Sequence, residues 1–314
     1  MYNSMRSRKV VILGAGHVGS HAAYALAQEG LCSEIVLVDI DKDKAVSQAL
    51  DVDDSIGFAG TETVVRAGEY SDVSDAAVVI NAIGEGRKPG QTRLDLLGRS
   101  AEMAEELIRD LKPFGIPGIF VSITNPCDVI ADYMRKGLGL PRERAFGTGT
   151  LLDTARLVRA ISRRAGVGRK SVQAYSLGEH GDSSMIPFSS IRIGGLGFRE
   201  FGLSEEELLE DTRQSGMIII EGKKSTEFGI GSAAADLVRC IFLDEKRILP
   251  ASVLLQGEYG ESEVHCGVPC RIGAGGIEKI IELPLSEKEK EQLHHSCEII
   301  REHIALAAEK GGEK

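Results

Sequence analysis

Residues 9–20 read KVVILGAGHVGS, a pattern that predicts the architecture of the first half of the chain. The first five residues form an apolar run that ends at a glycine, which is typical of a buried strand. Gly14, Gly16 and Gly19 follow with the spacing GxGxxG and lead into a segment with helical periodicity. The first glycine allows a tight turn, the second lets the backbone approach a pyrophosphate, and the third lets helix and strand pack closely. The stretch therefore predicts a strand–turn–helix unit that binds a dinucleotide at the N-terminus of the helix.

An acidic residue at the end of the next strand supports this prediction. Residues 34–39 read EIVLVD, and Asp39 ends this apolar strand about 20 residues after the glycines. An acid in this place binds the hydroxyls of the adenosine ribose and repels a 2′-phosphate. Ile40 and Asp41 supply no cation, so we expect NAD rather than NADP. A glycine-rich turn without a ligand is the alternative, but the glycine motif and Asp39 occur at the spacing of a cofactor site and favour that interpretation.

The remaining pattern predicts an α/β protein with two closely apposed domains. Buried strands are expected at 77–82 and 119–123 with helices between them, which indicates the doubly wound parallel sheet of a Rossmann fold. After residue 148 this sheet pattern ends. We therefore predict an NAD-binding Rossmann domain at 1–147 and a mixed α+β substrate-binding and catalytic domain at 148–314. The expected elements of the second half are helices near 151–165, 205–220, 231–242 and 286–308, and short alternating segments at 171–177 and 186–193.

Composition and charge exclude several classes of partner. The net charge of −10 argues against nucleic acid and against an anionic membrane surface. The chain has no apolar run of about 18 residues or more and begins without a secretory signal, so we expect a cytoplasmic protein with no membrane contact. The cysteines are scattered and form no zinc pattern, which predicts buried free thiols and no metal site. They are Cys32, Cys127, Cys240, Cys266, Cys270 and Cys297.

Six motifs in a fixed order give the chain its resemblance to the lactate/malate dehydrogenase family. The motifs are the glycine motif at 14–19, RKPGQTR at 87–93, ITNP at 123–126, LDTAR at 152–156, GEHGDS at 178–183 and GEYG at 257–260. Their order and spacing cover nearly the whole chain, which makes the resemblance highly specific. It implies an NAD-dependent dehydrogenase that acts in carboxylic acid metabolism and in glycolysis. Such an enzyme moves a hydride between nicotinamide and the 2-carbon of a small L-2-hydroxy acid.

The resemblance also implies roles for the residues of the reaction. His180 matches the acid/base, and its ordinary pKa near 6.5 suits proton transfer in both directions. Asp153 matches the carboxylate that orients this imidazole. Arg156 lies three residues further in a helical stretch, so both share one face, and it matches the bidentate partner of the substrate carboxylate. Arg93 matches the arginine of a mobile loop that polarises the carbonyl.

Other residues are implied to bind the substrate or the cofactor. Asn125 matches a hydrogen-bond partner of the substrate oxygen, and Thr226 a residue of the substrate pocket. The implied cofactor-binding residues are Gly14, Gly16, His17, Val18, Gly19, Asp39, Gly84 and Asn125.

The choice of substrate depends on Arg87, six residues before Arg93. Arginine there is typical of malate dehydrogenases, because it pairs with a second carboxylate, whereas lactate dehydrogenases usually have glutamine. Arg87 therefore favours malate and oxaloacetate. The segment GTGT at 147–150 and Thr226 are typical of lactate dehydrogenases, and NAIG at 81–84 is similar to branched 2-hydroxy acid dehydrogenases. These substrates stay open as alternatives, as does an arginine that faces solvent.

Two rival classes and the quaternary state complete the predictions. A non-catalytic NAD-binding protein would not need the complete set of reaction residues, and an NAD-dependent glycosidase needs a Cys/His metal site that Cys127 alone does not form.

The resemblance implies a homo-oligomer, a tetramer or a dimer. Related bacterial enzymes hold fructose 1,6-bisphosphate with an arginine and a histidine, where this chain has Val158 and Gln173. We therefore predict no activation by this effector.

Overall fold

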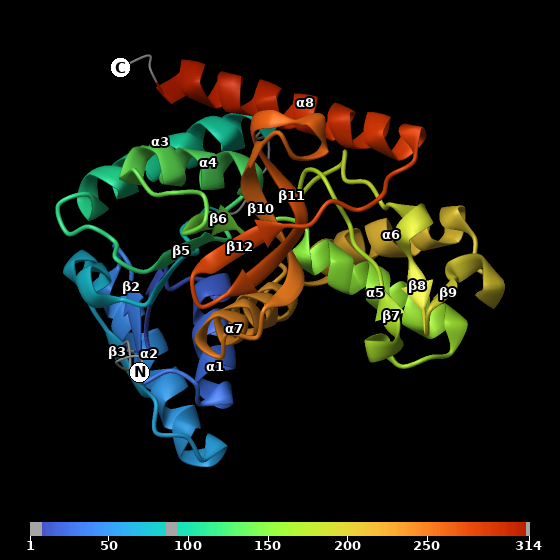
Figure 1. Cartoon of the computed structure of the whole chain (residues 1–314). Helices are drawn as coiled ribbons and strands as arrows, with labels where there is room; N and C mark the ends of the chain where they lie inside the picture. The colour runs from blue at the N-terminus through green and yellow to red at the C-terminus, as the bar shows by residue number, and fades with distance from the viewer. Residues whose placement is uncertain (1–7, 86–92, 312–314) are drawn as a thin grey trace, which may run out of the picture.

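A computed structural model describes residues 8–85 and 93–311, and nine of the described strands form one sheet (Figure 1). In spatial order the strands are β12 (Gly276–Ile280), β11 (Ser262–Gly273), β10 (Arg247–Gln256), β6 (Ala145–Gly147), β5 (Ile119–Ser122), β4 (Val78–Asn81), β1 (Lys9–Leu13), β2 (Glu34–Val38) and β3 (Val64–Ala67). The strands from β6 to β3 are parallel, and β10, β11 and β12 are antiparallel. The predicted Rossmann-type α/β fold is confirmed.

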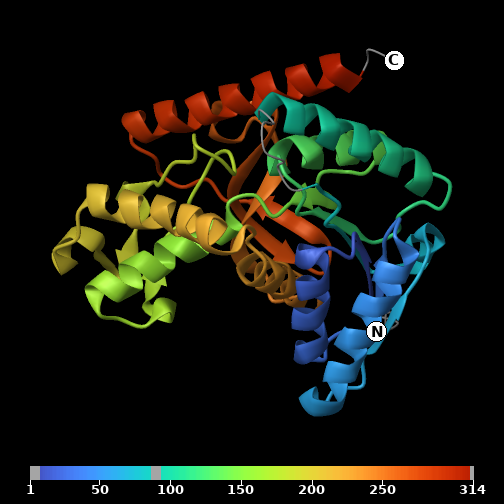
Figure 2. The same cartoon turned by 180° about the vertical axis from the view of Figure 1, so that it is seen from behind.

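Helices cover both faces of this sheet. The α-helices that the structure describes are α1 (His17–Glu29), α2 (Lys42–Ala59), α3 (Arg93–Leu111), α4 (Cys127–Leu138), α5 (Leu151–Ala165), α6 (Glu205–Lys223), α7 (Phe228–Phe242) and α8 (Glu287–Gly311). In Figures 1 and 2, α1, α2 and α7 lie on one side of the sheet, and α3, α4 and α8 lie on the other. Short 3-10 turns lie at Tyr70–Asp75, Arg169–Ser171, Phe188–Ser190, Phe198–Phe201 and Glu258–Gly260.

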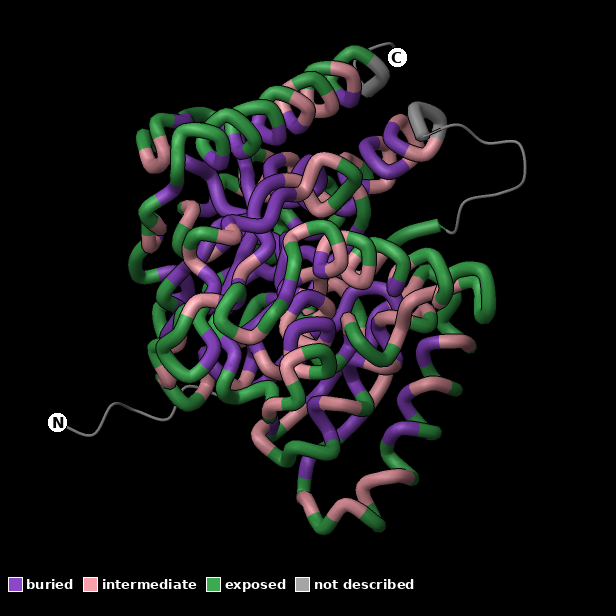
Figure 3. Tube along the Cα trace, turned by 90° about the vertical axis from the view of Figure 1, so that its right-hand side faces the viewer, coloured by how far each residue is buried: buried purple, intermediate pink, exposed green. Residues whose placement is uncertain are grey.

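Alternating side chains of β1 explain why it needs cover on both faces. Val10 and Ile12 belong to the core beneath α1 and α7, whereas Val11 and Leu13 belong to the core beneath α3 and α4. Successive side chains of a strand point to opposite faces, so a strand that is apolar throughout must be buried on both sides. Figure 3 shows the result, with buried residues concentrated in the central strands and exposed residues on the outer helix faces.

The expectation that the sheet ends near residue 148 is wrong. β10 pairs with β6 at Ser252 and Gly147, so the second half of the chain adds three antiparallel strands to the same sheet. These strands are absent from the expectations drawn from the sequence. Each contains a proline, Pro250 in β10 and Pro269 in β11, and proline normally argues against a central strand. In the structure the two prolines lie opposite each other in the β10–β11 pair.

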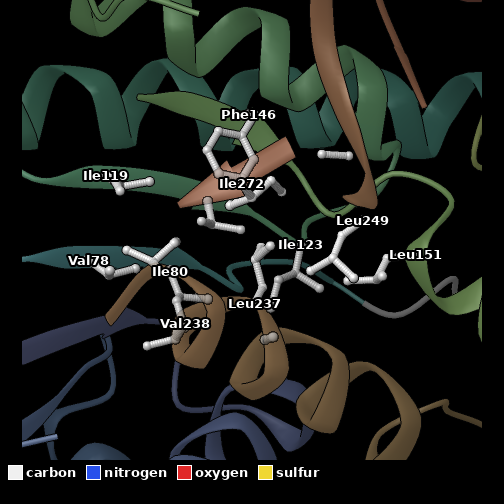
Figure 4. Packing of buried hydrophobic residues seen from close by; sticks show 14 of the residues in the cluster. Val78, Ile80, Ile119, Ile123, Phe146, Leu151, Leu237, Val238, Leu249 and Ile272 are labelled. Carbon is white, nitrogen blue, oxygen red and sulfur yellow. The ribbon is translucent and has the colours of Figure 1, made fainter. Parts of the chain in front are cut away.

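Residues from both halves of the chain share one core. Figure 4 shows Ile80 of β4 and Phe146 of β6 near Leu237 of α7, together with Leu249 of β10 and Ile272 of β11. The division into domains at 147/148 stays a prediction, but the two halves are joined by this core as well as by the sheet.

A smaller apolar core lies under α5 and α6. Leu157 and Ile161 of α5 pack with Leu208 of α6. A second, antiparallel sheet of β7 (Val172–Gln173), β8 (Arg192–Ile193) and β9 (Leu196–Gly197) borders it. The expected segments at 171–177 and 186–193 are therefore strands only over two residues each. None of the helices described is long and apolar enough to cross a membrane.

Candidate active site

The three glycines of the first turn meet three different surroundings, and these match the needs of a bound dinucleotide. Gly14 has φ +98°, and a Cβ atom on it would lie 2.8 Å from the carbonyl oxygen of Ala82. A Cβ atom on Gly19 would lie 1.8 Å from the carbonyl oxygen of Gly14, so only glycine lets α1 approach the turn. At Gly16 the nearest such atom is the Nζ of Lys44, at 4.0 Å. The turn is thus closed at its first and third glycines and open at the second, where the backbone would face a pyrophosphate.

Asp39 follows β2 directly and faces this turn. Its Oδ2 accepts a hydrogen bond from the backbone N of Ala15 at 2.7 Å. The same oxygen lies 3.2 Å from the Nζ of Lys44, in the first turn of α2. Sequence reasoning missed this lysine, because it considered only the two residues next to Asp39. The spacing of five residues across the start of a helix was the available signal, but spacing alone does not show which way a lysine points.

Other predicted cofactor residues lie at the carboxyl edge of the parallel strands. Val18 is half-buried in the first turn of α1, and the side chain of His17 is 80% exposed there. Gly84 is exposed just after β4, and Asn125 is exposed after β5. Since β1 separates β2 from β4, the order of the strands reverses at this edge, where open α/β sheets bind their ligands.

His180 and Asp153 meet across two segments of the chain. Thr154 of α5 accepts a hydrogen bond from the backbone N of Ser176 through its Oγ1 at 2.8 Å, which ties α5 to the segment before His180. Gly178 exchanges two backbone hydrogen bonds with Gly267 of β11, each 2.9 Å long. The Nδ1 atom of His180 then lies 2.6 Å from the Oδ2 of Asp153.

The electrostatics of this pair favour a protonated imidazole. Burial would lower the pKa of His180, but the charge and hydrogen bond of Asp153 outweigh it, so the pKa is raised above its ordinary value. Burial would raise the pKa of Asp153, but His180 and Arg156 outweigh it and the pKa is lowered. Because a carboxylate only accepts, Nδ1 carries the proton that faces Asp153. Nε2 is then the ring nitrogen that can exchange a proton with a ligand.

Arg156 binds the other oxygen of the same carboxylate. Its Nη1 donates to the Oδ1 of Asp153 at 3.1 Å, so the two residues share one face of α5 as predicted. Arg156 also lines a cavity of about 340 Å³ between α5, α6 and the start of α7. Thr226 lines the same cavity. The guanidinium has five N–H donors, so the bond to Asp153 leaves a planar fork for a carboxylate ligand.

Two predicted residues are not placed by these observations. Arg87 lies outside the described residues, and Arg93 begins α3 with only its backbone described. Within the described ranges, the structure contains no cluster of three or more His, Cys, Asp or Glu side chains that could hold a metal ion. The six cysteines are buried and unbridged.

Comparisons with known proteins agree along the whole chain. The profile of the lactate/malate dehydrogenase NAD binding domain matches residues 8–147, and that of the family's alpha/beta C-terminal domain matches residues 150–310. L-lactate dehydrogenase 1 of Bifidobacterium longum is 41% identical over 309 residues, covering 96% of this chain and 98% of that protein. An L-lactate dehydrogenase of Fusobacterium nucleatum is 40% identical over 311 residues, covering 96% and 98%.

Solved structures of two kinds of enzyme share this fold. The minor L-lactate dehydrogenase of Enterococcus mundtii in its ligands-bound form has a TM-score of 0.92 and 36% identity, covering 96% of this chain and 98% of that one. The malate dehydrogenase of Salinibacter ruber has a TM-score of 0.88 and 30% identity, with the same coverage.

Proposed function

The chain belongs to the lactate/malate dehydrogenase family, and on this premise we propose that it is an L-lactate dehydrogenase that interconverts pyruvate and L-lactate. As a member of that family it is an NAD-dependent oxidoreductase that acts on a CH–OH group. The observation that carries the proposal is the carboxylate of Asp153, which contacts both His180 and Arg156. One residue thereby sets the distance between a proton donor and a carboxylate-binding cation, as a 2-oxo acid requires.

The residues present fit the cofactor that the family uses. The open backbone at Gly16 would hold the pyrophosphate, and Asp39 at the end of β2 would bind the adenosine ribose. NADH, when bound, supplies the hydride that attacks C2 of the substrate. The protein residues supply the proton, the orientation of the substrate and the exclusion of water.

Reduction needs one proton on the carbonyl oxygen as C2 gains the hydride. Protonated His180 donates it from Nε2, the C=O double bond becomes a C–O–H group, and His180 is left neutral. Asp153 keeps the imidazole in the tautomer that makes Nε2 the reacting atom. Arg156 holds the C1 carboxylate, and Arg93 polarises the carbonyl. Oxidation of lactate reverses every one of these transfers.

We propose pyruvate rather than a dicarboxylate as the substrate because of the activities for which the relatives are named. The sequence analysis favoured oxaloacetate on the strength of Arg87, whereas the relatives at 40–41% identity are named L-lactate dehydrogenases. Malate and oxaloacetate are the second candidate, supported by Arg87 and by the likeness to a malate dehydrogenase structure. A branched 2-hydroxy acid is a third.

Substrate profiling separates these candidates. The oxidation of NADH is measured with pyruvate, oxaloacetate, 2-oxoisocaproate and phenylpyruvate at matched concentrations. The proposal expects the highest kcat/KM with pyruvate. A higher kcat/KM with oxaloacetate would replace lactate by malate, and turnover of none of the four would refute the dehydrogenase assignment.

We also propose that the enzyme is cytoplasmic and assembles as a homo-oligomer, a tetramer or a dimer. Light scattering on the purified protein measures the mass directly, and a value of about 34 kDa would contradict the proposal, because the single chain has a mass of 33.7 kDa.

A further inference from the structure

A second carboxylate, besides that of Asp153, contacts His180. Asp128 is the second residue of α4 and is only 2% exposed. Its Oδ2 accepts a hydrogen bond from the backbone N of His180 at 2.9 Å. Its Oδ1 accepts one from the Oγ of Ser252, on β10, at 2.6 Å. One side chain thus joins α4, the His180 segment and β10.

Hydrogen bonding alone does not explain a charge in this place. An asparagine would accept from the His180 backbone through its oxygen and donate to Ser252 through its nitrogen, with nearly the same shape. A buried carboxylate is costly to desolvate, and among the residues that the structure describes no lysine or arginine forms an ion pair with Asp128. Burial accordingly raises the pKa of Asp128 to about 6. The negative charge therefore needs a partner nearby.

The protonated imidazole of His180 supplies a positive charge that interacts with this carboxylate. The charge of Asp128 raises the pKa of His180, after the larger effects of burial and of Asp153. The charges of Asp153 and Arg156 on α5 also act on the imidazole, and the charge of Glu179 acts on Asp128. The charge of Asp128 also acts on the thiols of Cys127 on α4 and Cys266 on β11. Burial raises the pKa of Cys127, and a hydrogen bond with Cys297 together with burial raises that of Cys266, so both thiols stay protonated.

We infer that Asp128 is a positioning residue of the reaction: it holds the backbone of His180 and, as a buried anion, favours the protonated imidazole. The inference rests on the proposed function, in which His180 donates a proton to a 2-oxo acid. The pair Asp153 and Asp128 then acts from two sides, one on Nδ1 and one on the backbone N. Proton release from His180 is harder with both anions present than with Asp153 alone.

The test is a titration of His180 in the enzyme without cofactor or substrate. Imidazole NMR signals are followed with pH, and His180→Asn identifies the signal of His180. The inference expects Asp128→Asn to lower the pKa of His180 by about 0.5–1 unit, because one nearby negative charge is lost. Asp132→Asn is the matched control, since it removes a buried carboxylate one turn further along α4 that contacts Lys136 and His265 instead. An unchanged pKa of His180 in folded Asp128→Asn would overturn the inference.

Kinetics provide a second readout that a merely structural role would not produce. In Asp128→Asn the alkaline limb of pyruvate reduction and the acid limb of lactate oxidation should both move to lower pH by the same amount. At a pH on the alkaline limb this is a 3- to 10-fold loss of kcat/KM for reduction, converted from about 0.5–1 unit. Limbs that stay at the same pH in both directions in Asp128→Asn would contradict the inference. Asp128→Ala, which also loses the bond to the His180 backbone, should be slower than Asp128→Asn by about 10-fold.

The unmodified enzyme keeps the inference testable if Asp128→Asn does not fold. Coupled groups titrate together, so the His180 signals should show a second inflection near pH 6, where Asp128 gains its proton. A single inflection would overturn the inference. These titrations need no turnover, so they distinguish a failure of this inference from a failure of the proposed function, which the substrate profile tests.

Discussion

The Nδ1 atom of His180 lies 2.6 Å from the Oδ2 of Asp153, although the two residues are 27 positions apart. This contact links two segments that are attached separately to the large sheet. The segment of His180 is attached by the bonds of Gly178 to β11, and Asp153 lies in α5, which follows β6. The carboxylate raises the pKa of the imidazole against the effect of burial. The pH range in which His180 stays protonated therefore depends on Asp153.

Replacing the acid/base residue tests the chemistry of this pair. His180→Asn should bind NADH normally and lose about 10²–10⁴-fold in turnover, because only proton transfer is removed. Stopped-flow kinetics and NADH fluorescence measure the two quantities. Near-native turnover would show that His180 is a structural residue of its loop.

Removing the partner charge tests the direction of the pKa shift. The raised pKa of His180 means that reduction is supported below this pKa and is lost as the pH rises through it. Asp153→Asn should lower the pKa, so the alkaline limb of kcat/KM for pyruvate should move to lower pH. A limb that stays in place would assign it to another group.

Arg156 is tested by a change that keeps its charge. Arg156→Lys should raise KM for pyruvate by about 10–100-fold, because a lysine cannot form the planar, two-point grip on the C1 carboxylate. The affinity for NADH should not change. If KM stays within about 2-fold of the original, Arg156 serves only to hold Asp153.

The glycines of the first turn provide a matched pair. Gly16→Ala adds a methyl group with no protein atom closer than 4.0 Å, so the melting temperature should hold while the affinity for NADH falls by about 10-fold or more. Gly19→Ala places its methyl 1.8 Å from the carbonyl oxygen of Gly14, so it should lower both. Equal NADH affinity in Gly16→Ala and the unmodified enzyme would move the pyrophosphate elsewhere.

The position of Lys44 leads to a prediction about the choice between NADH and NADPH. In the unmodified enzyme its ammonium pairs with Asp39 at 3.2 Å. Asp39→Ser should leave this cation unpaired and able to hold a 2′-phosphate, which raises the ratio of kcat/KM for NADPH over NADH by about 10–100-fold. The double variant with Lys44→Gln should lose most of the gain. A ratio that is the same with and without Lys44 would show that the lysine does not face the cofactor.

Much of this site was predictable because its residues act through local geometry. The spacing of Gly14, Gly16 and Gly19 specifies a turn, and Asp153 and Arg156 share a face because a helix repeats every 3.6 residues. Contacts between distant segments were not predictable in this way. The hydrogen bonds that join Asp128 to His180 and Ser252 span 52 and 124 positions, and no sequence pattern predicts them. His180 itself could be assigned only through the family resemblance.

The strands that the sequence analysis missed also have a consequence for motion. β6 pairs with β10 at Gly147 and Ser252, and α1 packs so closely on α7 that a Cβ on Gly231 would lie 3.0 Å from the carbonyl carbon of His21. A hinge between the two halves would have to break the backbone pairing and open a shared apolar core. The cofactor edge and His180 are therefore joined by one sheet and one core, and we expect the reacting groups to keep their spacing through each catalytic cycle. We expect any closure over the substrate to come from surface segments, at a far smaller cost in free energy than the swing of a whole domain.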